Sequence, residues 1–422
     1  MKDYIFCLLI LYSSITFSQE LNPSKTTNPI LITPEILAGI TGDSNSDFPD
    51  HKLQKQLILS LSWDHTNNLQ DWARVLNGPR TGISIGYTDF GNSENLGSAI
   101  SALTFIEFHP LNIDDLTMHI GTGASYFNKK FDPVTNPNNQ AVSTKFTWSF
   151  RAFSYYTFLK TKKMDWRAGI GVFHHSNGHS SLPNQGYNSF LLSLSTDIKT
   201  GLNKETIKDL TDKPYIEKDK ASYLSFRVGY GTNVLSKAFN DNKDVYTFSG
   251  EYGKIYKNTF KLGIGFYYRF YQSYYDYIVD NESLVQDGRE FENYKDNPTK
   301  YASNIGLTIN GEIFLNHFGI DLQIGFNLYK PSYDIDWRLN QGWSYVPKEI
   351  PENSAIVLGE YNSYYKLKKL ISTRLGLKYY LVATNKQPKS NLYLGVFING
   401  NLGQADFTEI AIGYVHQLKR KK

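Results

Sequence analysis

Hydrophobic residues alternate with glycine or polar residues along most of the chain. Between residues 320 and 328, Ile, Leu and Phe occupy the even positions, and Asp, Gln, Gly and Asn occupy the odd ones. The same period of two recurs over residues 224–230, 262–270 and 371–381. Because successive side chains of a strand point to opposite faces, each segment predicts a strand with one apolar and one polar face. A soluble β-sandwich would show the same alternation. The length of the segments favours a transmembrane antiparallel β-barrel, with lipid outside and a polar interior.

The pattern predicts many such strands and almost no helix. Seventeen ranges qualify as candidate strands: 30–42, 55–65, 79–89, 96–108, 115–127, 143–160, 164–176, 188–199, 221–232, 244–254, 257–272, 301–315, 318–330, 354–362, 366–382, 389–400 and 404–417. Bacterial barrels usually have an even number of strands, so we expect 12 to 16 in one all-β barrel over residues 19–422. Polar stretches at 128–142, 201–219, 273–300 and 331–352 are expected to be loops, and 68–76 to form one short helical turn. No internal repeat is recognised.

Composition agrees with a barrel and narrows the chemistry. The 422 residues include 31 Tyr, 26 Phe and 32 Gly. Abundant aromatic residues and glycine are typical of large β-barrels with aromatic girdles. The net charge of +4 is too small to indicate a nucleic-acid partner.

The N-terminus predicts a secretory signal peptide over residues 1–18. Lys2 supplies a positive charge, a mostly apolar stretch follows, and Thr16 and Ser18 offer small residues before a cleavage point at Gln19. The one cysteine, Cys7, lies inside this segment, so the mature chain would hold no thiol. A cysteine nucleophile, a disulfide framework and Cys-ligated zinc are thereby excluded.

One predicted hairpin, residues 164–199, combines polar residues suited to catalysis. Its centre reads GVFHHSNGHSSLPNQGYN over residues 171–188. His174 and Ser176 continue the apolar face of the first strand, and Asn188 shares the parity of the apolar residues of the second. All three side chains are therefore expected on the lipid-facing side. Polar groups are costly there, which makes sense if the substrate is itself a lipid.

These residue types are those of a serine esterase. His174 is two residues from Ser176 on the same face, so its imidazole could accept the hydroxyl proton. Asn188 could accept a hydrogen bond from the other ring nitrogen and fix the tautomer, as a neutral replacement for the usual carboxylate. The backbone N–H groups of Asn177 and Gly178 are candidates for stabilising an oxyanion. An ordinary polar rim of a barrel remains the structural alternative for the same residues.

The run also resembles the PagL-type lipid A 3-O-deacylase family. That family's motif is His-x-Ser-Asn followed by Pro-Asn-x-Gly, with a third triad member fourteen residues after the histidine. This chain matches at His174, Ser176, Asn177, the segment from Pro183 to Gly186 and position 188. The resemblance implies an outer-membrane carboxylic ester hydrolase that acts on lipid A of lipopolysaccharide. It assigns the base to His174 and the nucleophile to Ser176. Asn184, inside the matched segment, is a further candidate for an oxyanion or positioning role. Its best-known members carry Glu where this chain has Asn188.

A second family, outer-membrane phospholipase A, is similar over the same residues. It uses His, Ser and Asn and reads His-x-Ser-Asn-Gly-x-Ser, which matches this chain as far as Ser180. The similarity implies a glycerophospholipid substrate, and by analogy a Ca²⁺ ion with oxygen ligands from Asn184 and Ser180; no other cofactor is implied. Looser resemblance to longer chains, the acyloxyacyl hydrolases, comes from three short segments: 95–97, 126–132 and 405–407.

Two other interpretations stay open for the chain. His174, His175 and His179 lie close together in sequence, but His175 faces away from His174, which counts against a metal site. A non-catalytic barrel, such as a porin or a lipid transporter, would have the same strands. The sequence therefore predicts an outer-membrane serine esterase acting on lipid A, with phospholipase A and a transport barrel as alternatives. It predicts neither the ester position nor the oligomeric state.

Overall fold

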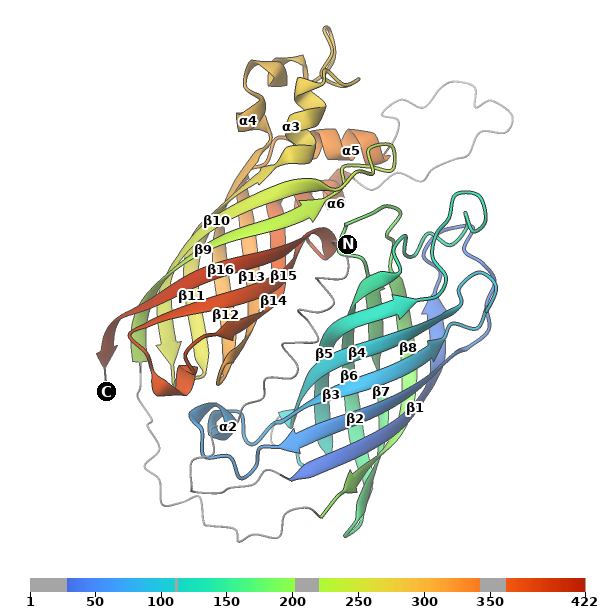
Figure 1. Cartoon of the computed structure of the whole chain (residues 1–422), viewed down its shortest axis with the longest axis vertical. Helices are drawn as coiled ribbons and strands as arrows, with labels where there is room; N and C mark the ends of the chain where they lie inside the picture. Colours follow the sequence, from blue (N-terminus) through green and yellow to red (C-terminus); the bar gives the residue numbers. More distant parts are fainter. Residues whose placement is uncertain (1–28, 111–112, 202–219, 342–361, 422) are drawn as a thin grey trace.

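Sixteen antiparallel strands form two separate β-barrels of eight strands each (Figure 1). The computed structural model describes residues 29–110, 113–201, 220–341 and 362–421. The predicted signal peptide, residues 1–18, lies outside the described residues, and so does nearly all of the candidate strand at 354–362. The other sixteen candidate strands correspond to the sixteen that form.

Barrel 1 contains the first eight strands. They are β1 (Ile30–Gly42), β2 (Gln54–Asp64), β3 (Arg80–Asp89), β4 (Ser98–Phe108), β5 (Leu116–Phe127), β6 (Phe146–Lys160), β7 (Met164–Ser176) and β8 (Tyr187–Lys199). Each strand pairs with the next, and β8 returns to β1 with Leu194 opposite Ile36, which closes the barrel.

Barrel 2 repeats this arrangement with the last eight strands. They are β9 (Lys220–Asn233), β10 (Lys243–Tyr256), β11 (Phe260–Tyr271), β12 (Ser303–Leu315), β13 (Phe318–Tyr329), β14 (Ile371–Tyr380), β15 (Ser390–Asn401) and β16 (Gln404–Lys421). Pairing of β16 with β9, with Ile410 opposite Tyr230, closes it.

The expectation of one barrel over residues 19–422 is therefore wrong, although the all-β barrel class is correct. Alternation determines which face of a strand is apolar, but it does not determine which two strands pair to close a barrel. Here β8 pairs with β1 rather than with β9. Twenty residues, 200–219, separate β8 from β9 in the sequence, whereas only 161–163 separate β6 from β7 at the same end of barrel 1.

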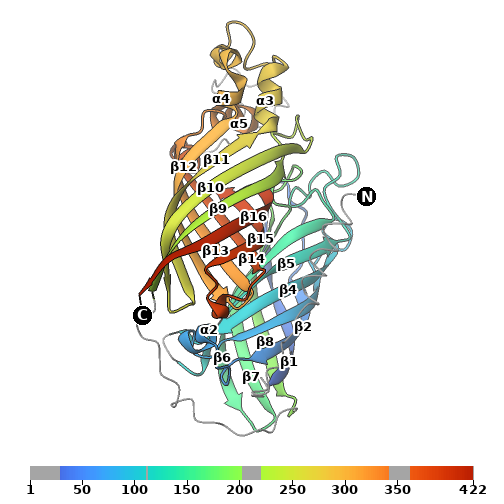
Figure 2. The ribbon, with the colours of Figure 1, turned by 60° about the vertical axis from the view of Figure 1, so that its left-hand side comes forward.

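Short helices cover one end of barrel 2 (Figure 2). They are α3 (Gln272–Val279), η3 (Glu292–Asp296), α4 (Pro298–Tyr301), α5 (Tyr333–Gln341) and α6 (Asn362–Leu370). Residues 273–300 and the described start of 331–352 are thus partly helical, where loops were expected. Tyr274, Tyr277 and Ile278 of α3 are buried in an aromatic cluster with Phe407 of β16, and burial of this apolar face stabilises the helix. The short turn expected at 68–76 is present as α2 (Asp71–Val75), and a further turn, η4, spans Thr384–Lys386. None of the described helices is long and apolar enough to cross a bilayer.

The inside of each barrel is filled with paired charges. In barrel 1, the Glu35 carboxylate accepts hydrogen bonds from Arg151 Nη2 and Tyr155 Oη, both at 2.7 Å. In barrel 2, Lys378 Nζ lies 2.8 Å from Glu312 Oε2, and Arg374 Nη2 lies 2.8 Å from Asp321 Oδ1. Eight-stranded barrels have interiors just wide enough for side chains to fill. These ion pairs place compensating charges inside the barrels and occupy space that an aqueous channel would need.

The outward faces of both barrels are apolar. Exposed outward residues include Ile36, Leu57, Ile85, Leu192, Val228, Ile264, Ile309, Leu322 and Ile412. Exposure of so many large apolar side chains would be unfavourable in water and is expected for barrels that face lipid.

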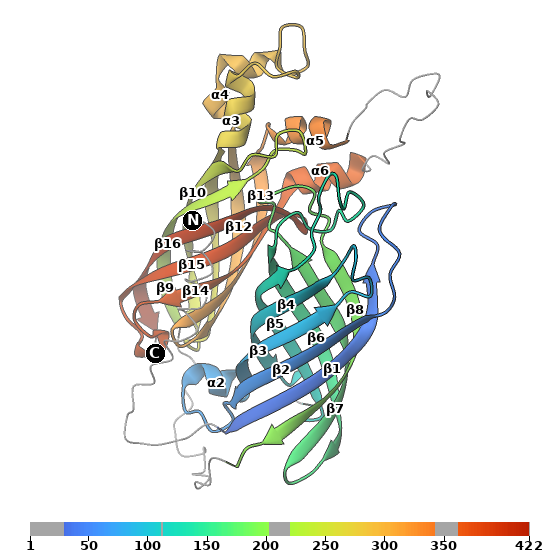
Figure 3. The same ribbon diagram turned by 45° about the vertical axis from the view of Figure 1, so that its right-hand side comes forward.

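The two barrels lie side by side (Figure 3) and contact each other at both ends. At the end where β7 finishes, Trp148 Nε1 of barrel 1 donates to Thr408 Oγ1 of barrel 2 at 3.1 Å. At the opposite end, Asn258 Nδ2 of barrel 2 donates to Asp71 Oδ2 of α2 at 3.1 Å.

Candidate active site

The predicted hairpin forms as β7 and β8, with His174 paired directly opposite Asn188. β7 is the seventh strand of the chain, as counted from the sequence. Phe173 and His175 point into barrel 1 and are fully buried, so His174, Ser176 and Asn188 lie on the outward face. Asn188 is exposed and His174 half-buried, whereas Ser176 is only 8% exposed.

His174 is held by its strand partner. Its Nδ1 atom lies 2.7 Å from Asn188 Oδ1. An amide oxygen only accepts hydrogen bonds, so Nδ1 carries the proton and Nε2 is left as the acceptor. The adjacent His175 has a different environment: its Nδ1 bonds Ser149 Oγ at 2.9 Å, and its ring packs against Phe127 and Phe173 inside the barrel. The two neighbouring histidines therefore face opposite sides of the sheet.

Ser176 Oγ accepts two hydrogen bonds from the loop between β7 and β8. Asn184 Nδ2 donates at 2.9 Å and the Gly178 backbone N–H at 3.3 Å. No bond from Ser176 Oγ to His174 Nε2 is present among these described residues. Hydrogen bonds of catalytic groups are often long before substrate binds. Both bonds are donated to Ser176 Oγ, so the hydroxyl proton of the serine is not needed for either of them.

The backbone N–H of Asn177, a candidate for stabilising an oxyanion, has another hydrogen-bond partner in the structure. Its backbone N–H donates to Asn184 Oδ1 at 2.9 Å, so it is directed away from Ser176 Oγ. Its side-chain amide bonds Ser143 Oγ and the Ser181 carbonyl at 3.1 and 2.7 Å. Asn177 thus fixes the shape of the loop and orients Asn184, while the donors on Ser176 come from Gly178 and Asn184.

Gly186 allows the loop to come close to His174. Its φ is +78°, which a residue with a Cβ adopts only with strain. A Cβ at this position would lie 2.8 Å from His174 Cε1 and 3.0 Å from the His175 carbonyl oxygen. The backbone N–H of Gly186 donates to the Ala141 carbonyl of the β5–β6 loop at 2.8 Å. The glycine of the Pro-Asn-x-Gly segment is therefore required by the position of the imidazole.

The more distant segments of the resemblance build the support for this loop. The Asn95 carbonyl accepts from Asn139 Nδ2 at 2.9 Å, and Asn139 Oδ1 accepts from Tyr187 Oη at 3.1 Å. Phe127 stacks on Tyr187 with ring centroids 5.2 Å apart. Asp132 accepts the backbone N–H groups of residues 134 and 135.

The oxygen atoms considered for Ca²⁺ are engaged in hydrogen bonds of the loop. Ser180 Oγ donates to the Asn177 carbonyl at 2.9 Å, and Asn184 Oδ1 accepts from the Asn177 N–H. Within the part of the chain that the structure describes, no group of three or more His, Cys, Asp or Glu side chains could hold a metal ion. Both oxygen atoms therefore contribute to the hydrogen bonds that shape the loop.

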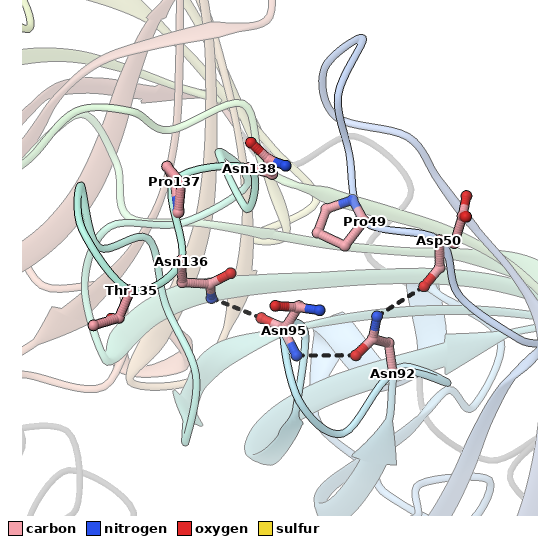
Figure 4. A pocket seen from close by; sticks show the side chains of 8 residues that line it. All are labelled: Pro49, Asp50, Asn92, Asn95, Thr135, Asn136, Pro137 and Asn138. Atoms are coloured by element: carbon pink, nitrogen blue, oxygen red, sulfur yellow. Dashed lines mark hydrogen bonds between the residues drawn. The ribbon is translucent and has the colours of Figure 1, made fainter.

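A polar pocket of about 280 Å³ lies among the loops at the same end of barrel 1 (Figure 4). Asparagine side chains dominate it, and Asn92 and Asn136 bond the Asp50 and Asn95 carbonyls there. None of His174, Ser176 and Asn188 lines this pocket.

Contacts from barrel 2 to the active-site loop were not predicted from the sequence. Asn240, in the β9–β10 loop, donates to the Leu182 carbonyl and accepts from the Leu182 N–H. Thr408 accepts from Trp148, the strand neighbour of Ser176. Thr408 directly follows the segment 405–407 noted in the sequence, which was the one local signal near this contact.

Comparison with known proteins finds one matching family model. Residues 58–197 match the family model described as lipid A 3-O-deacylase (PagL). The crystal structure of the outer membrane enzyme PagL is 18% identical, covering 39% of this chain and 97% of that chain with a TM-score of 0.27. A bacterial polysaccharide outer membrane secretin is 11% identical over 94% of this chain and all of that one (TM-score 0.19). A mutant porin from Rhodopseudomonas blastica is 8% identical over 92% and 99% (TM-score 0.17). No curated protein matches.

The matched residues run from β2 to β8, and the hairpin with His174, Ser176 and Asn188 lies within them. Together with the apolar outward faces, this match identifies an outer-membrane β-barrel protein. Barrel 1, through residues 58–197, is therefore a domain of the lipid A 3-O-deacylase (PagL) family, a family of ester hydrolases.

Proposed function

We propose that barrel 1 hydrolyses an acyl ester of lipid A, with Ser176 as nucleophile, His174 as general base and Asn188 as the residue that orients the base. The observation that supports this most strongly is the pairing of His174 with Asn188 at 2.7 Å on the lipid-facing side. A buried or solvent-facing site would suit a soluble ester. An outward site suits a substrate that is part of the bilayer.

In the first step His174 Nε2 takes the proton of Ser176, and Oγ attacks the ester carbonyl. The imidazolium that forms is held by Asn188 Oδ1, which stabilises it less than a carboxylate would because the amide is neutral. The C–O bond to the sugar then breaks, His174 returns the proton to the sugar hydroxyl, and the acyl group stays on Ser176.

The tetrahedral intermediate needs donors for its oxyanion. Gly178 N–H and Asn184 Nδ2 both donate to Ser176 Oγ, and we propose that they donate to the neighbouring oxyanion once the ester is bound. Loss of one such donor typically costs about 10²–10³ in kcat. In the second step His174 takes a proton from water, and the hydroxide formed attacks the acyl-enzyme carbonyl. The bond between that carbon and Ser176 Oγ then breaks, His174 returns the proton to Oγ, and the fatty acid is released.

The substrate's acyl chain has a surface to lie on. Along β7 and β8, below the triad, the outward residues Ile170, Phe190 and Leu192 are 61–64% exposed. This apolar surface adjoins the site and faces the lipid, so an acyl chain reaches Ser176 without leaving the hydrocarbon region. If the chain starts in the periplasm, β7 ends at the outer leaflet, where lipid A resides.

The test is an assay of the purified full-length protein on lipopolysaccharide and on phosphatidylethanolamine, with the lipid products measured by mass spectrometry. Loss of a sugar-linked 3-hydroxyacyl chain from lipid A is expected, and Ser176→Ala should abolish it. Ser181→Ala is the matched control and should keep most of the activity, because this serine of the same loop takes part through its backbone carbonyl, which the substitution leaves in place. Production of lysophospholipid with lipid A untouched would assign phospholipase activity instead, and no product from either lipid would reject the esterase.

A further inference from the structure

Barrel 2 contains a strand that corresponds to the active-site strand of barrel 1. β7 and β15 are each the seventh strand of their barrel, and both finish at the end where the barrels meet near Ser176. β7 reads GVFHHSN over residues 171–177, and β15 reads GVFINGN over residues 395–401. Phe173 and Phe397 are both fully buried inside their barrels, so the two strands also agree in which face points outward.

The residues needed for hydrolysis are absent from the described β15 strand and the turn that follows it. Ile398 stands at the position of His174, and Gly400 at that of Ser176. Only residues 402 and 403 join β15 to β16, so the loop that carries Asn184 and Gly186 in barrel 1 has no counterpart. Barrel 2 thus has the architecture of barrel 1 without its chemistry.

We propose that barrel 2 is a non-catalytic copy of barrel 1 whose function is to hold the active-site loop of barrel 1, with Asn240 and Thr408 as positioning residues. This inference rests on the proposed esterase function of barrel 1. It assigns barrel 2 a role in the same reaction, through its contacts with Leu182, Gly178 and Trp148.

Asn240 fixes the middle of the loop. Its Oδ1 accepts from the Leu182 N–H at 2.8 Å, and its Nδ2 donates to the Leu182 carbonyl at 2.7 Å. Both backbone groups of one loop residue are therefore satisfied by a single side chain of the other barrel. Two residues later in the loop is Asn184, the side chain that donates to Ser176 Oγ. Fixing Leu182 restricts the positions that Asn184 adopts.

Thr408 fixes the start of the loop. A Cβ built on Gly178 would lie 2.3 Å from Thr408 Oγ1, so barrel 2 packs directly against the backbone of Gly178. The Gly178 N–H is the second donor to Ser176 Oγ. Thr408 Oγ1 also accepts from Trp148, which pairs with Ser176 in the β6–β7 register. Thr408 thus contacts both the strand partner of Ser176, Trp148, and the glycine whose N–H donates to Ser176.

A third contact from barrel 2 holds the β5–β6 loop, which in turn supports the active-site loop. Lys237 Nζ, from the same β9–β10 loop as Asn240, donates to Gln140 Oε1 at 2.8 Å. The Gln140 carbonyl in turn accepts from the backbone N–H of Gln185 at 3.1 Å. The residues on both sides of Asn184 are therefore connected to barrel 2, directly at Leu182 and through Gln140 at Gln185.

This arrangement also determines the side from which substrate arrives. On the β6 side of Ser176, Thr408 of barrel 2 packs against Trp148 and Gly178. This covering agrees with the low exposure of the serine. The outward residues on the other side, along β7 and β8, remain exposed. Lipid therefore approaches along β8 and not between the barrels.

The experiment compares full-length variants in which only contacts from barrel 2 change. Asn240→Ala removes both bonds to Leu182, and Thr408→Val removes the hydroxyl while keeping the shape. Thr408→Ser restores the hydroxyl and serves as the rescue. Asp71→Ala is the matched control, because it removes a contact between the barrels at the opposite end.

Three readouts separate positioning from general loss of structure. They are the rate of fluorophosphonate labelling of Ser176, kcat and KM on lipid A, and amide hydrogen exchange of residues 177–186. For Asn240→Ala and Thr408→Val we expect labelling and kcat to fall about tenfold each, with KM little changed, since each loses hydrogen bonds worth about 1–1.5 kcal/mol. Exchange in the loop should become faster, while Thr408→Ser and Asp71→Ala stay near wild type.

The proposal is overturned if Asn240→Ala and Thr408→Val match Asp71→Ala in labelling, kcat and loop exchange. It is also overturned if all four variants lose activity equally, because the barrels would then contribute only to overall stability. Should the wild-type protein hydrolyse no ester, the proposed function fails by itself, and loop exchange alone still decides whether barrel 2 holds the loop.

Discussion

His174 Nδ1 and Asn188 Oδ1 lie 2.7 Å apart across directly paired positions of β7 and β8. Pairing in the sheet places the proposed base and the residue proposed to orient it opposite each other through the backbone register. The bond selects the tautomer in which Nε2 is free to accept a proton. The position of His174 relative to Asn188 is thus a consequence of strand pairing, and in the proposed triad the base is oriented by a neutral side chain.

Removal of the Asn188 amide is expected to lower activity without unfolding the barrel. Asn188→Ala should reduce kcat about 10- to 100-fold, because a hydrogen bond that orients a group which becomes charged is worth about 1.5–3 kcal/mol. Asn188→Asp should keep or raise kcat, since a carboxylate also stabilises the imidazolium. Steady-state hydrolysis of lipid A by the two variants is the measurement. Equal activity of Asn188→Ala and wild type would remove Asn188 from the site.

Gly186 is expected to be intolerant of alanine for a local reason. A Cβ there meets His174 Cε1 at 2.8 Å, in addition to the strain of a φ of +78°. Gly186→Ala should therefore displace the imidazole and lower fluorophosphonate labelling of Ser176. Gly288→Ala is the matched control, since Gly288 has a φ of +74° and nothing within 4 Å of its Cβ position. Similar losses in both variants would point to backbone strain alone.

The filled interiors predict that the protein does not behave as a porin. The described lumens contain buried ion pairs such as Glu35 with Arg151 and Lys378 with Glu312. We expect planar bilayers with the reconstituted full-length protein to show no steady ionic conductance, because opening a path would separate these desolvated charges. Stepwise conductance that scales with salt concentration would instead support the transport-barrel alternative.

Acid is expected to loosen the contact of the active-site loop with barrel 2 through His179. Burial lowers the pKa of His179 below its usual 6.5, although Asp406 and a hydrogen bond with Val234 act in the opposite direction; Lys368 also lowers it. Because the pKa of His179 is lower in the folded protein than in the unfolded chain, the contribution of neutral His179 to stability is full above about pH 6.5. It is lost as the pH falls through the folded-state pKa.

The measurement is the thermal unfolding midpoint at about pH 7.5 and about pH 5, where histidine changes its charge. Wild type should lose more stability on acidification than His179→Asn, a variant that does not titrate and tolerates the left-handed φ of +67°. An identical decrease in both proteins would show that His179 does not contribute.

The strands and the shared face of the three candidate residues could be predicted from the sequence for the same physical reason. Alternation is local, so it located β7 and β8 and also the shared face of His174, Ser176 and Asn188. Barrel closure depends on which distant strand pairs with β8, and the alternation is equally compatible with β1 and with β9. A single barrel was therefore expected where two exist.

The contacts between the barrels had no comparable local signal. Asn240 is 58 residues from Leu182, and Thr408 is 260 residues from Trp148. Neither belongs to a pattern that distinguishes it from other polar residues near strand ends. The helical cap was missed because residues 273–300 are rich in polar residues, while the spacing of Tyr274, Tyr277 and Ile278 already matched one face of a helix.

The most direct test of the active site is to locate the adduct that a fluorophosphonate forms with the full-length protein. Peptide mass spectrometry should find the phosphonyl group on Ser176 in wild type. The adduct should disappear in Ser176→Ala and form much more slowly in His174→Ala, because the serine then has no base. A wild-type protein that stays unmodified, or an adduct on another residue, would contradict the assignment of Ser176 as an activated nucleophile on the outer face of barrel 1.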